Sequence, residues 1–279
     1  MRGPRRYNAS SSRVRFSVDR ESEAHQGFFA ALADRYNGLY SNPERTRFAG
    51  PFLDGILRRY APGNDVLDVA CGTFALDLPL LARGYHVVGR DLSPAMVAQA
   101  RRTLRSSRKQ GDVAVGDMRT LDLGRTFDAI LCLGTAFNYL VAPVDIRAAV
   151  LAFRSHLRPR GFLVLDLTNF DGWIRRPTNA RAEMDRTFPD GLRVTIFGLN
   201  DQDLRRRIHI ARFIMASKRG RNLDLRFSEA PLRIWKKDDL RKMLRGAGFH
   251  VVGWWGDLRV GRSYARRTSP RMVAGAVKK

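Results

Sequence analysis

The fold of this chain is decided by residues 65–102, DVLDVACGTFALDLPLLARGYHVVGRDLSPAMVAQARR. The apolar run at 66–70 has the length and the β-branched content of a buried parallel strand, and a sharp glycine turn follows it at 71–73. Apolar residues at helical spacing over 74–83 predict a helix, and 85–89 is a second short apolar strand. This order of strand, turn, helix and strand indicates a βαβ unit in an open α/β sheet.

Three residues of the segment predict the kind of ligand. Asp91 follows the second strand, about 20 residues after the glycine turn, a spacing that places its carboxylate where ribose hydroxyls bind in such sheets. The turn contains only Gly72, whereas a pyrophosphate cradle needs G-x-G-x-x-G. Asp68 at the strand end would repel a phosphate and would suit a cation. The segment therefore predicts a cationic cofactor that contains adenosine.

The turn resembles the first motif of the class I S-adenosylmethionine (SAM) methyltransferases, D-x-A/G-C/G-G-T/S-G. Three further stretches match that family in order: 91–96 after the second strand, 116–119 after the third, and 127–140 across the fourth strand and its loop. In this family the acidic residue of 116–119 meets the adenine amino group, and the loop at 134–140 faces the methyl group. The resemblance covers roughly residues 30–170.

The resemblance implies a set of cofactor-binding residues, with S-adenosylhomocysteine as the product. N-terminal helices of this family fold over the cofactor, so two tyrosines at helical spacing there are included, although a core role is the alternative for them. The predicted set is Tyr36, Tyr40, Asp68, Ala70, Cys71, Gly72, Thr73, Asp91, Leu92, Met96, Asp117, Met118 and Leu133.

The rest of the chain completes a Rossmann-like domain. We expect an α/β fold, a mostly parallel seven-stranded sheet with helices on both faces, plus an antiparallel β insertion (a cap or dimerisation sheet) before the last helix. The core strands are expected near 65–70, 85–90, 112–116, 127–132 and 161–167. The predicted parts are a basic disordered tail at 1–25, N-terminal helices and the SAM-binding core at 26–170, the insertion at 171–235, and a C-terminal helix and strand pair at 236–279.

Composition limits the class of protein. The 279 residues are 44% hydrophobic with two cysteines, which cannot form a disulfide framework. No apolar run reaches the length of a membrane span, the basic N-terminus lacks an apolar signal core, and no His/Cys cluster has metal-ligand spacing. These features predict a cytoplasmic protein without a metal. The strand edges of the insertion are a candidate homodimer interface.

The formal net charge of +23 predicts attraction of anions. Nucleic acid is one candidate partner, but it is not favoured, because the arginines are spread along the whole chain and are not interleaved with aromatic residues. A general preference for arginine explains the charge at least as well. If the acceptor is a small molecule, an acidic acceptor suits the positive electrostatic field of this chain.

The fourth-strand loop carries the candidate catalytic residue. Methyl transfer needs alignment and exclusion of water, and it needs a base only if the acceptor must lose a proton. Tyr139 is the predicted catalytic residue, and Asn138 beside it is a second group for orienting an amine or hydroxyl. The alternative is that Tyr139 only packs under the insertion. Residues 133–137, LGTAF, lack the Asn/Asp-Pro-Pro-aromatic motif of enzymes that methylate exocyclic base amines.

Three functions remain open from the sequence. The first is a methyltransferase that acts on nitrogen or oxygen of a small molecule. Such an enzyme would resemble the glycine and amino-sugar N-methyltransferases. The second is an RNA methyltransferase, suggested by the charge. The third is a non-catalytic SAM-binding or interaction protein, suggested by Phe74, which replaces the usual glycine of the turn, and by Arg90, which stands where an apolar residue is usual.

Overall fold

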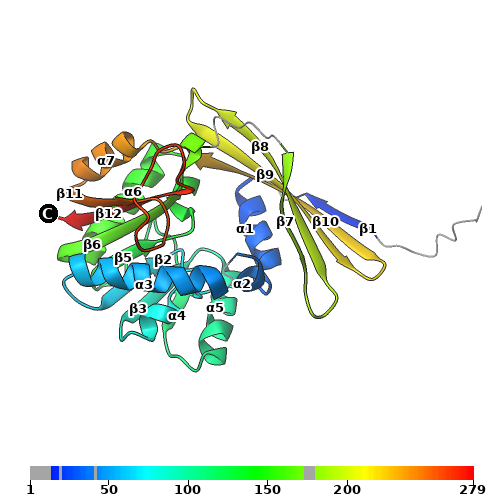
Figure 1. Ribbon diagram of the computed structural model, residues 1–279, viewed down its shortest axis with the longest axis horizontal. Helices are drawn as coiled ribbons and strands as arrows, with labels where there is room; N and C mark the ends of the chain where they lie inside the picture. Colours follow the sequence, from blue (N-terminus) through cyan, green and yellow to red (C-terminus); the bar gives the residue numbers. More distant parts are fainter. Residues whose placement is uncertain (1–13, 19–20, 41–42, 173–179) are drawn as a thin grey trace, which may run out of the picture. The chain divides into compact units, whose positions relative to one another are not determined.

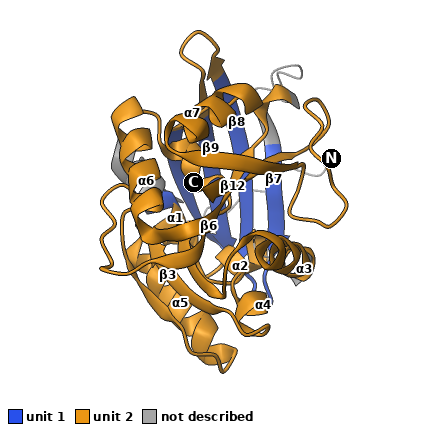
Figure 2. Ribbon diagram, turned by 90° about the vertical axis from the view of Figure 1, so that its left-hand side faces the viewer, with its two compact units in different colours: residues 1–28, 178–201, 211–230 blue, residues 29–177, 202–210, 231–279 orange. Residues whose placement is uncertain are grey.

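The computed structural model describes residues 14–18, 21–40, 43–172 and 180–279. The chain forms two compact units, which Figure 2 colours separately. The smaller unit is made of residues 1–28, 178–201 and 211–230, and the larger unit of 29–177, 202–210 and 231–279. No helix in the described ranges is long and apolar enough to cross a membrane.

The larger unit is built on a seven-stranded sheet in the order β11-β12-β6-β5-β2-β3-β4 (Figure 1). Strand β12 is antiparallel to both of its neighbours, and the pairs among β6, β5, β2, β3 and β4 are all parallel. The prediction of a mostly parallel seven-stranded sheet is thereby confirmed. The strands are β2 (Asp65–Val69), β3 (His86–Asp91), β4 (Asp112–Val115), β5 (Phe127–Cys132), β6 (Leu157–Thr168), β11 (Phe249–Trp255) and β12 (Arg271–Lys278).

Helices cover both faces of this sheet, because its strands are apolar on both sides. Along β5, Ile130 packs with α6 (Pro143–His156) and α7 (Lys237–Gly246) in one core. Leu131 points the other way and joins a second core with α3 (Pro43–Tyr60) and α5 (Pro94–Ser106). The alternation of neighbouring residues between two cores is the expected geometry of a central strand.

The helix expected over 74–83 is much shorter than predicted. Only α4 (Leu78–Leu81) forms there, and turns occupy most of the stretch before it. The reason is Phe74, whose φ of 63° is left-handed and incompatible with an α-helix. The N-terminal helices are α1 (Glu21–Leu32), the short α2 (Tyr36–Leu39) and α3, and the predicted break at 42–43 falls partly outside the described residues.

The second sheet has the order β1-β10-β9-β8-β7. Its strands β7 (Ala180–Thr187), β8 (Arg193–Asp203), β9 (Ile208–Arg219) and β10 (Asn222–Arg233) form the predicted antiparallel insertion. The edge strand β1 (Val14–Val18) pairs in parallel with β10, with Phe16 opposite Leu225.

Strand β1 lies in the stretch for which the sequence predicts a disordered tail. The structure instead forms this strand and the start of α1 there, because the apolar residues of VRFSV alternate with a strand's period of two. The rest of the predicted tail, residues 1–13, lies outside the described residues. The other predicted boundaries between parts of the chain stay predictions.

Candidate cofactor and acceptor site

The glycine turn after β2 is held by backbone contacts to β3. Three of its residues have left-handed φ angles: Ala70 at 70°, Gly72 at 53° and Phe74 at 63°. The N–H groups of Ala70 and Cys71 both donate to the carbonyl oxygen of Arg90, at 2.6 and 3.0 Å. Two non-glycine residues in this region of φ persist only where surrounding contacts fix them, so the turn is a rigid element.

Asp91 lies beside this turn, as the spacing predicted. Its Oδ2 accepts from the N–H of Gly72 at 2.8 Å, and its Oδ1 accepts from the N–H of Ser93 at 2.9 Å. Ser93 in turn caps α5 by accepting from the N–H of Met96 at 3.4 Å. Burial raises the pKa of Asp91, and these two backbone hydrogen bonds oppose that shift. One carboxylate therefore joins the turn to the start of the next helix.

A pair of buried carboxyl groups lies under the turn. Asp68 is 2% exposed and Asp77 is fully buried. The Oδ1 of Asp68 and both carboxyl oxygens of Asp77 have no donor from any other described side chain, and the two carboxyl groups hydrogen-bond to each other when one of them is protonated. Burial raises the pKa of Asp77 to about 7, and burial together with the charges of Asp77 and Asp91 raises the pKa of Asp68 well above its usual range.

This pair tests whether the site suits the predicted cofactor. Buried carboxyl oxygens without donors are costly, and a cationic ligand would relieve that cost. SAM carries both a sulfonium and an ammonium group, so the pair fits it and would oppose a phosphate. Sequence reasoning found Asp68 but missed Asp77, which lies in a stretch with the spacing of an ordinary helix.

Phe74 does not point toward the ligand side of the turn. Its side chain is fully buried in the core beneath α5. A β-carbon built on Gly89 would lie 2.7 Å from Phe74 Cε2, and one built on Gly111 would lie 3.4 Å from Phe74 Cε1. The ring therefore fills a socket that two glycines leave open. Phe74 replaces the usual glycine by adopting the glycine's backbone conformation and sending its ring inward.

The presence of an arginine at position 90 is explained by its hydrogen-bond partners. Its Nη1 and Nη2 donate to Asp112 Oδ1 and Oδ2 at 3.1 and 3.0 Å, across the edge of the sheet. Its Nη1 also donates to the carbonyl of Gly89 at 2.8 Å. This fork geometry is the strong bidentate form of an arginine–carboxylate pair, and it keeps the guanidinium at the sheet edge.

Helix α2 is tied to the turn by one side chain. The Oγ1 of Thr73 donates to Asn37 Oδ1, and Asn37 Nδ2 donates to Thr103 Oγ1 of α5 at 3.3 Å. Because Asn37 follows Tyr36, this link holds the predicted Tyr36–Tyr40 pair near the turn. The ring centroids of the two tyrosines are 5.1 Å apart. The charges of Arg45, Asp91 and Arg271 all act on the phenol of Tyr36, whose pKa is raised mainly by burial.

The loop after β5 is held by a buried ion pair that the sequence did not reveal. Gly134 and Thr135 have φ angles of 67° and 77°. Asp166, whose side chain is fully buried, accepts from the N–H of Gly134 at 3.0 Å and from Arg271 Nε at 2.7 Å. Arg271 Nη1 donates to Thr135 Oγ1 at 2.8 Å. Arg45 Nη2 lies 3.9 Å from Asp166 and contributes a second positive charge.

Tyr139 ends the short helix η1 (Ala136–Tyr139) of this loop. Burial is the main reason that its pKa is raised, and the neighbouring Tyr36 and Tyr40 add to the shift. The shift favours the protonated phenol, and the predicted catalytic role of Tyr139 stays a prediction. Asn138 is a correction, because its side chain is buried and occupied, donating to Arg233 O at 2.9 Å and accepting from the N–H of Thr168 at 3.2 Å.

The remaining predicted residues lie in different environments. Leu92 is 43% exposed beside Asp91, whereas Met96 and Leu133 are buried. Asp117 accepts from Arg119 Nη2 at 2.6 Å, and this partner is the main reason that its pKa is lowered. Their contacts with a cofactor stay predictions.

Neither cysteine has the environment of a nucleophile, and the described ranges hold no metal site. Burial raises the pKa of the thiols of Cys71 and Cys132, which keeps them protonated. Within the part of the chain that the structure describes, no group of three or more His, Cys, Asp or Glu residues is placed to hold a metal ion.

Known proteins are similar to this chain in sequence and in fold. A family model described as "Methyltransferase domain" matches residues 66–161. A glycine/sarcosine N-methyltransferase of Parasynechococcus marenigrum (strain WH8102) is 33% identical over 157 residues, which is 56% of this chain and 55% of that protein. This chain thus spans about half the length of that relative. A protein of the same name from Halorhodospira halochloris is 28% identical over 91% of this chain and 88% of its own length.

A solved structure extends the similarity over nearly the whole chain. It is SAM-bound CalS10, an amino pentose methyltransferase from Micromonospora echinaspora involved in calicheamicin biosynthesis. It superposes with a TM-score of 0.66 at 26% identity, covering 91% of this chain and 97% of that one. The chain thus matches a methyltransferase domain over residues 66–161, and over nearly its whole length it is similar in fold to a SAM-bound methyltransferase.

Proposed function

We propose that this enzyme methylates the nitrogen of a small-molecule amine. The observation that carries the proposal is the buried carboxyl pair of Asp68 and Asp77, which has no cationic partner among the described residues, beneath a turn bound by Asp91, a site suited to a cationic adenosine cofactor. The choice of nitrogen is supported by the names of the similar proteins, which are a glycine/sarcosine N-methyltransferase and an amino pentose methyltransferase.

The proposed cofactor contacts follow from charge. Asp91 accepts from the ribose hydroxyls, and Asp68 with Asp77 faces the ammonium group. Arg45, whose side chain is 32% exposed and whose Nη2 lies 3.9 Å from Asp166, is the cation proposed to hold the cofactor's carboxylate. The proposal retains the remaining residues predicted from the sequence: Tyr36, Tyr40, Ala70, Cys71, Gly72, Thr73, Leu92, Met96, Asp117, Met118 and Leu133.

Bound SAM supplies an electrophilic methyl group, so that the acceptor's N–C bond forms as the S–C bond breaks, giving S-adenosylhomocysteine and a protonated amine that releases its proton to solvent. A neutral amine already has its lone pair, so the protein needs to orient it rather than to deprotonate it. Tyr139 suits that task, because its phenol oxygen can accept a hydrogen bond from an amine N–H, which leaves the lone pair free, and its ring excludes water.

Three finer features complete the proposal. The acceptor carries a negative charge, supported by the field of a chain with formal charge +23. The enzyme works in a reducing cytoplasm, supported by two buried thiols without a disulfide. It forms a homodimer through the insertion, supported by the sheet edge that β7 leaves in the described ranges.

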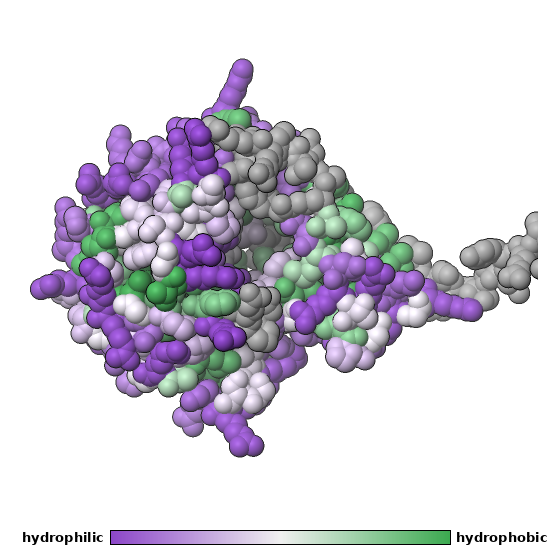
Figure 3. Space-filling model, in the orientation of Figure 1, coloured by the Kyte–Doolittle hydropathy of each residue, from purple (hydrophilic) through white to green (hydrophobic). Residues whose placement is uncertain are grey.

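RNA is the competing acceptor, and only the charge favours it. Many described arginines are paired with carboxylates, as Arg158 is with Asp65 and Asp128. On the face shown in Figure 3, hydrophilic residues are scattered among apolar ones rather than gathered into one stripe. A nucleic-acid surface would concentrate unpaired positive charge along a single path.

The test is transfer of labelled methyl from SAM to matched acceptors, using nuclease-treated enzyme. Glycine and sarcosine are compared with glycolate, which keeps the carboxylate but replaces the amine by a hydroxyl, and a nucleotide-linked amino sugar is compared with its N-acetyl form. Label on an amine but not on its matched control supports the proposal. Label on glycolate, or on added RNA alone, would overturn it.

A further inference from the structure

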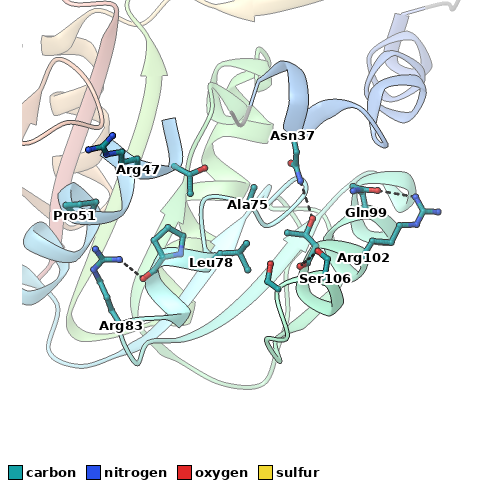
Figure 4. Close-up of a pocket in the computed structure, with 13 residues that line it drawn as sticks. Asn37, Arg47, Pro51, Ala75, Leu78, Arg83, Gln99, Arg102 and Ser106 are labelled. Carbon is teal, nitrogen blue, oxygen red and sulfur yellow. Dashed lines mark hydrogen bonds between the residues drawn. The ribbon is translucent and has the colours of Figure 1, made fainter. Parts of the chain in front are cut away.

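A cavity of about 920 Å³ lies in the larger unit, among α3, α4 and α5, apart from the Asp166 loop (Figure 4). Its walls combine an apolar part with hydroxyl, amide and guanidinium groups. The lining residues that matter here are Arg47, Arg83, Arg102, Pro51, Leu78 and Ser106. Neither the predicted cofactor contacts nor the proposed acceptor site uses these residues.

The cavity is cationic. Arg47 comes from α3, Arg83 follows α4, and Arg102 comes from α5, so three separate elements each bring one guanidinium. None of the thirteen residues drawn in Figure 4 is acidic. Figure 4 shows Arg47 and Arg83 at one end of the cavity and Arg102 at the other. Two separated positive ends match a ligand with more than one negative group.

The guanidinium groups keep donors for a ligand. Arg102 Nη1 donates to the neutral Gln99 at 3.1 Å, and Arg83 Nη1 donates to the carbonyl of Pro79 at 2.9 Å. Arg83 Nε lies 3.7 Å from Asp54 Oδ2. Among the side chains that the structure describes, Arg47 and Arg102 have no carboxylate partner. Each guanidinium has five N–H groups, so most of them are available.

We propose that this cavity binds a small phosphorylated molecule with at least two negative charges. Its phosphate groups contact the arginines, for which bidentate phosphate binding is the favoured geometry. Its organic part packs on Leu78 and Pro51. Ser106 lies in the last turn of α5. The carbonyl end of the helix disfavours negative charge there and suits hydroxyl groups of the ligand.

Occupancy of the cavity is coupled to the cofactor turn through Asn37. This residue lines the cavity, and its amide also joins Thr73 of the turn to Thr103 of α5. A ligand that contacts Asn37 acts on the link that positions both the turn and Tyr36. By thermodynamic reciprocity, a phosphorylated ligand that changes the affinity for SAM is itself bound more or less tightly when SAM is present.

The test is calorimetric titration of the full chain with inorganic pyrophosphate, at fixed ionic strength and with saturating S-adenosylhomocysteine so that the cofactor site is filled. The variant Arg47→Gln/Arg102→Gln removes two of the three cations. The control Arg147→Gln/Arg245→Gln makes the same charge change on α6 and α7, across the sheet. We expect one site per chain, weakened about tenfold or more in the first variant only, because charge-assisted bonds are lost.

The other outcomes are equally decisive. Equal weakening in both double variants would show that pyrophosphate follows the net charge alone, and the site would be abandoned. If citrate binds as tightly as pyrophosphate, the cavity is a general polyanion site, and the proposal of a phosphate site is overturned. An RNA oligonucleotide that displaced pyrophosphate at far lower concentration would also overturn the proposal. The coupling is checked by the SAM affinity with and without pyrophosphate, and Asn37→Ala should abolish that difference.

Discussion

Two loops at the carboxyl end of the parallel strands are built alike but differ in charge balance. The turn after β2 and the loop after β5 both contain left-handed residues, and each has a backbone N–H bound by a carboxylate, Asp91 in one and Asp166 in the other. Asp166 is neutralised by Arg271 at 2.7 Å. Under the turn, by contrast, the buried Asp68–Asp77 pair has no cationic partner among the described residues.

The difference distinguishes a frame, meaning the buried Asp166–Arg271 ion pair that holds the β5 loop, from a binding site. A buried ion pair with its hydrogen bonds satisfied holds a loop in one geometry without any ligand. Buried carboxyl groups without donors cost free energy in the empty protein, and a cationic ligand recovers that cost on binding. We therefore interpret the β5 loop as preformed scaffolding and the β2 turn as the place where binding energy is gained.

The largest expected effect comes from breaking the frame. Arg271→Met leaves Asp166 charged and buried, and we expect the free energy of unfolding to fall by about 3–5 kcal/mol. Arg266→Met is the matched control, because Arg266 pairs with Asp171 at 2.9 Å but is 69% exposed. Its loss should cost much less, because exposed ion pairs contribute little to stability. Urea denaturation measures both, and equal losses would refute the contrast.

Next in size is the loss of the carboxylate that bridges the turn. Asp91→Ala removes the proposed ribose acceptor and frees the N–H of Gly72, so we expect the Kd for S-adenosylhomocysteine to rise about 100-fold, or about 2.7 kcal/mol. Asp112→Ala, which removes the partner of Arg90 at the same sheet edge, should leave that Kd nearly unchanged. Calorimetry distinguishes them. Retained binding in Asp91→Ala would move the ribose site elsewhere.

The third prediction concerns the pH dependence of stability in the cofactor-free protein. Burial raises the pKa of Asp77 to about 7, above the value of an unfolded aspartic acid. A carboxyl group with a raised pKa favours folding while it is protonated, so its contribution is lost as pH rises through about 7. Unfolding should cost less at pH 8 than at pH 5, by on the order of 2 kcal/mol.

Asp77→Asn isolates that contribution. The variant lacks the titrating group, and its amide can donate to Asp68, so its stability should change less between pH 5 and pH 8. Denaturation of both proteins at the two pH values gives the difference, which reports the Asp68–Asp77 pair, because the charge of Asp77 also raises the pKa of Asp68. A parallel pH dependence in the two proteins would show that Asp77 does not titrate in this range.

The smallest effect is expected at Tyr139. Tyr139→Phe keeps the half-buried ring and removes the hydroxyl, so we expect kcat/KM to fall about tenfold, or about 1.4 kcal/mol, through lost orientation of the acceptor. The pH–rate profile should keep its shape, because burial keeps this phenol protonated. A shift of the limb near neutral pH would instead identify Tyr139 as a base.

The sequence predicted the β2 turn better than the β5 loop, for a physical reason. Strand, turn and carboxylate of the first lie within the 27 residues from Asp65 to Asp91, so their spacing is visible in the chain. The frame of the second depends on Asp166 and Arg271, which only the antiparallel pairing of β6 with β12 brings together. A contact across such a separation leaves no local periodicity to detect.

The missed features near the turn have a related cause. Asp77 was hidden because 74–83 has helical spacing, whereas the left-handed Phe74 prevents a helix there. Strand β1 was missed because a short basic stretch is a weak strand signal until β10 supplies its partner. In both cases tertiary contacts overrode local preference.

The socket around Phe74 constrains the order in which descendants of this sequence can change. A side chain at position 89 would meet the ring at 2.7 Å, so Gly89 cannot be lost first without a steric clash. Loss of the ring first opens a hole that costs about 3–5 kcal/mol. A substitution at either position therefore costs stability, and Cys71 Sγ, 2.8 Å from a β-carbon built on Gly89, keeps that position closed even without the ring.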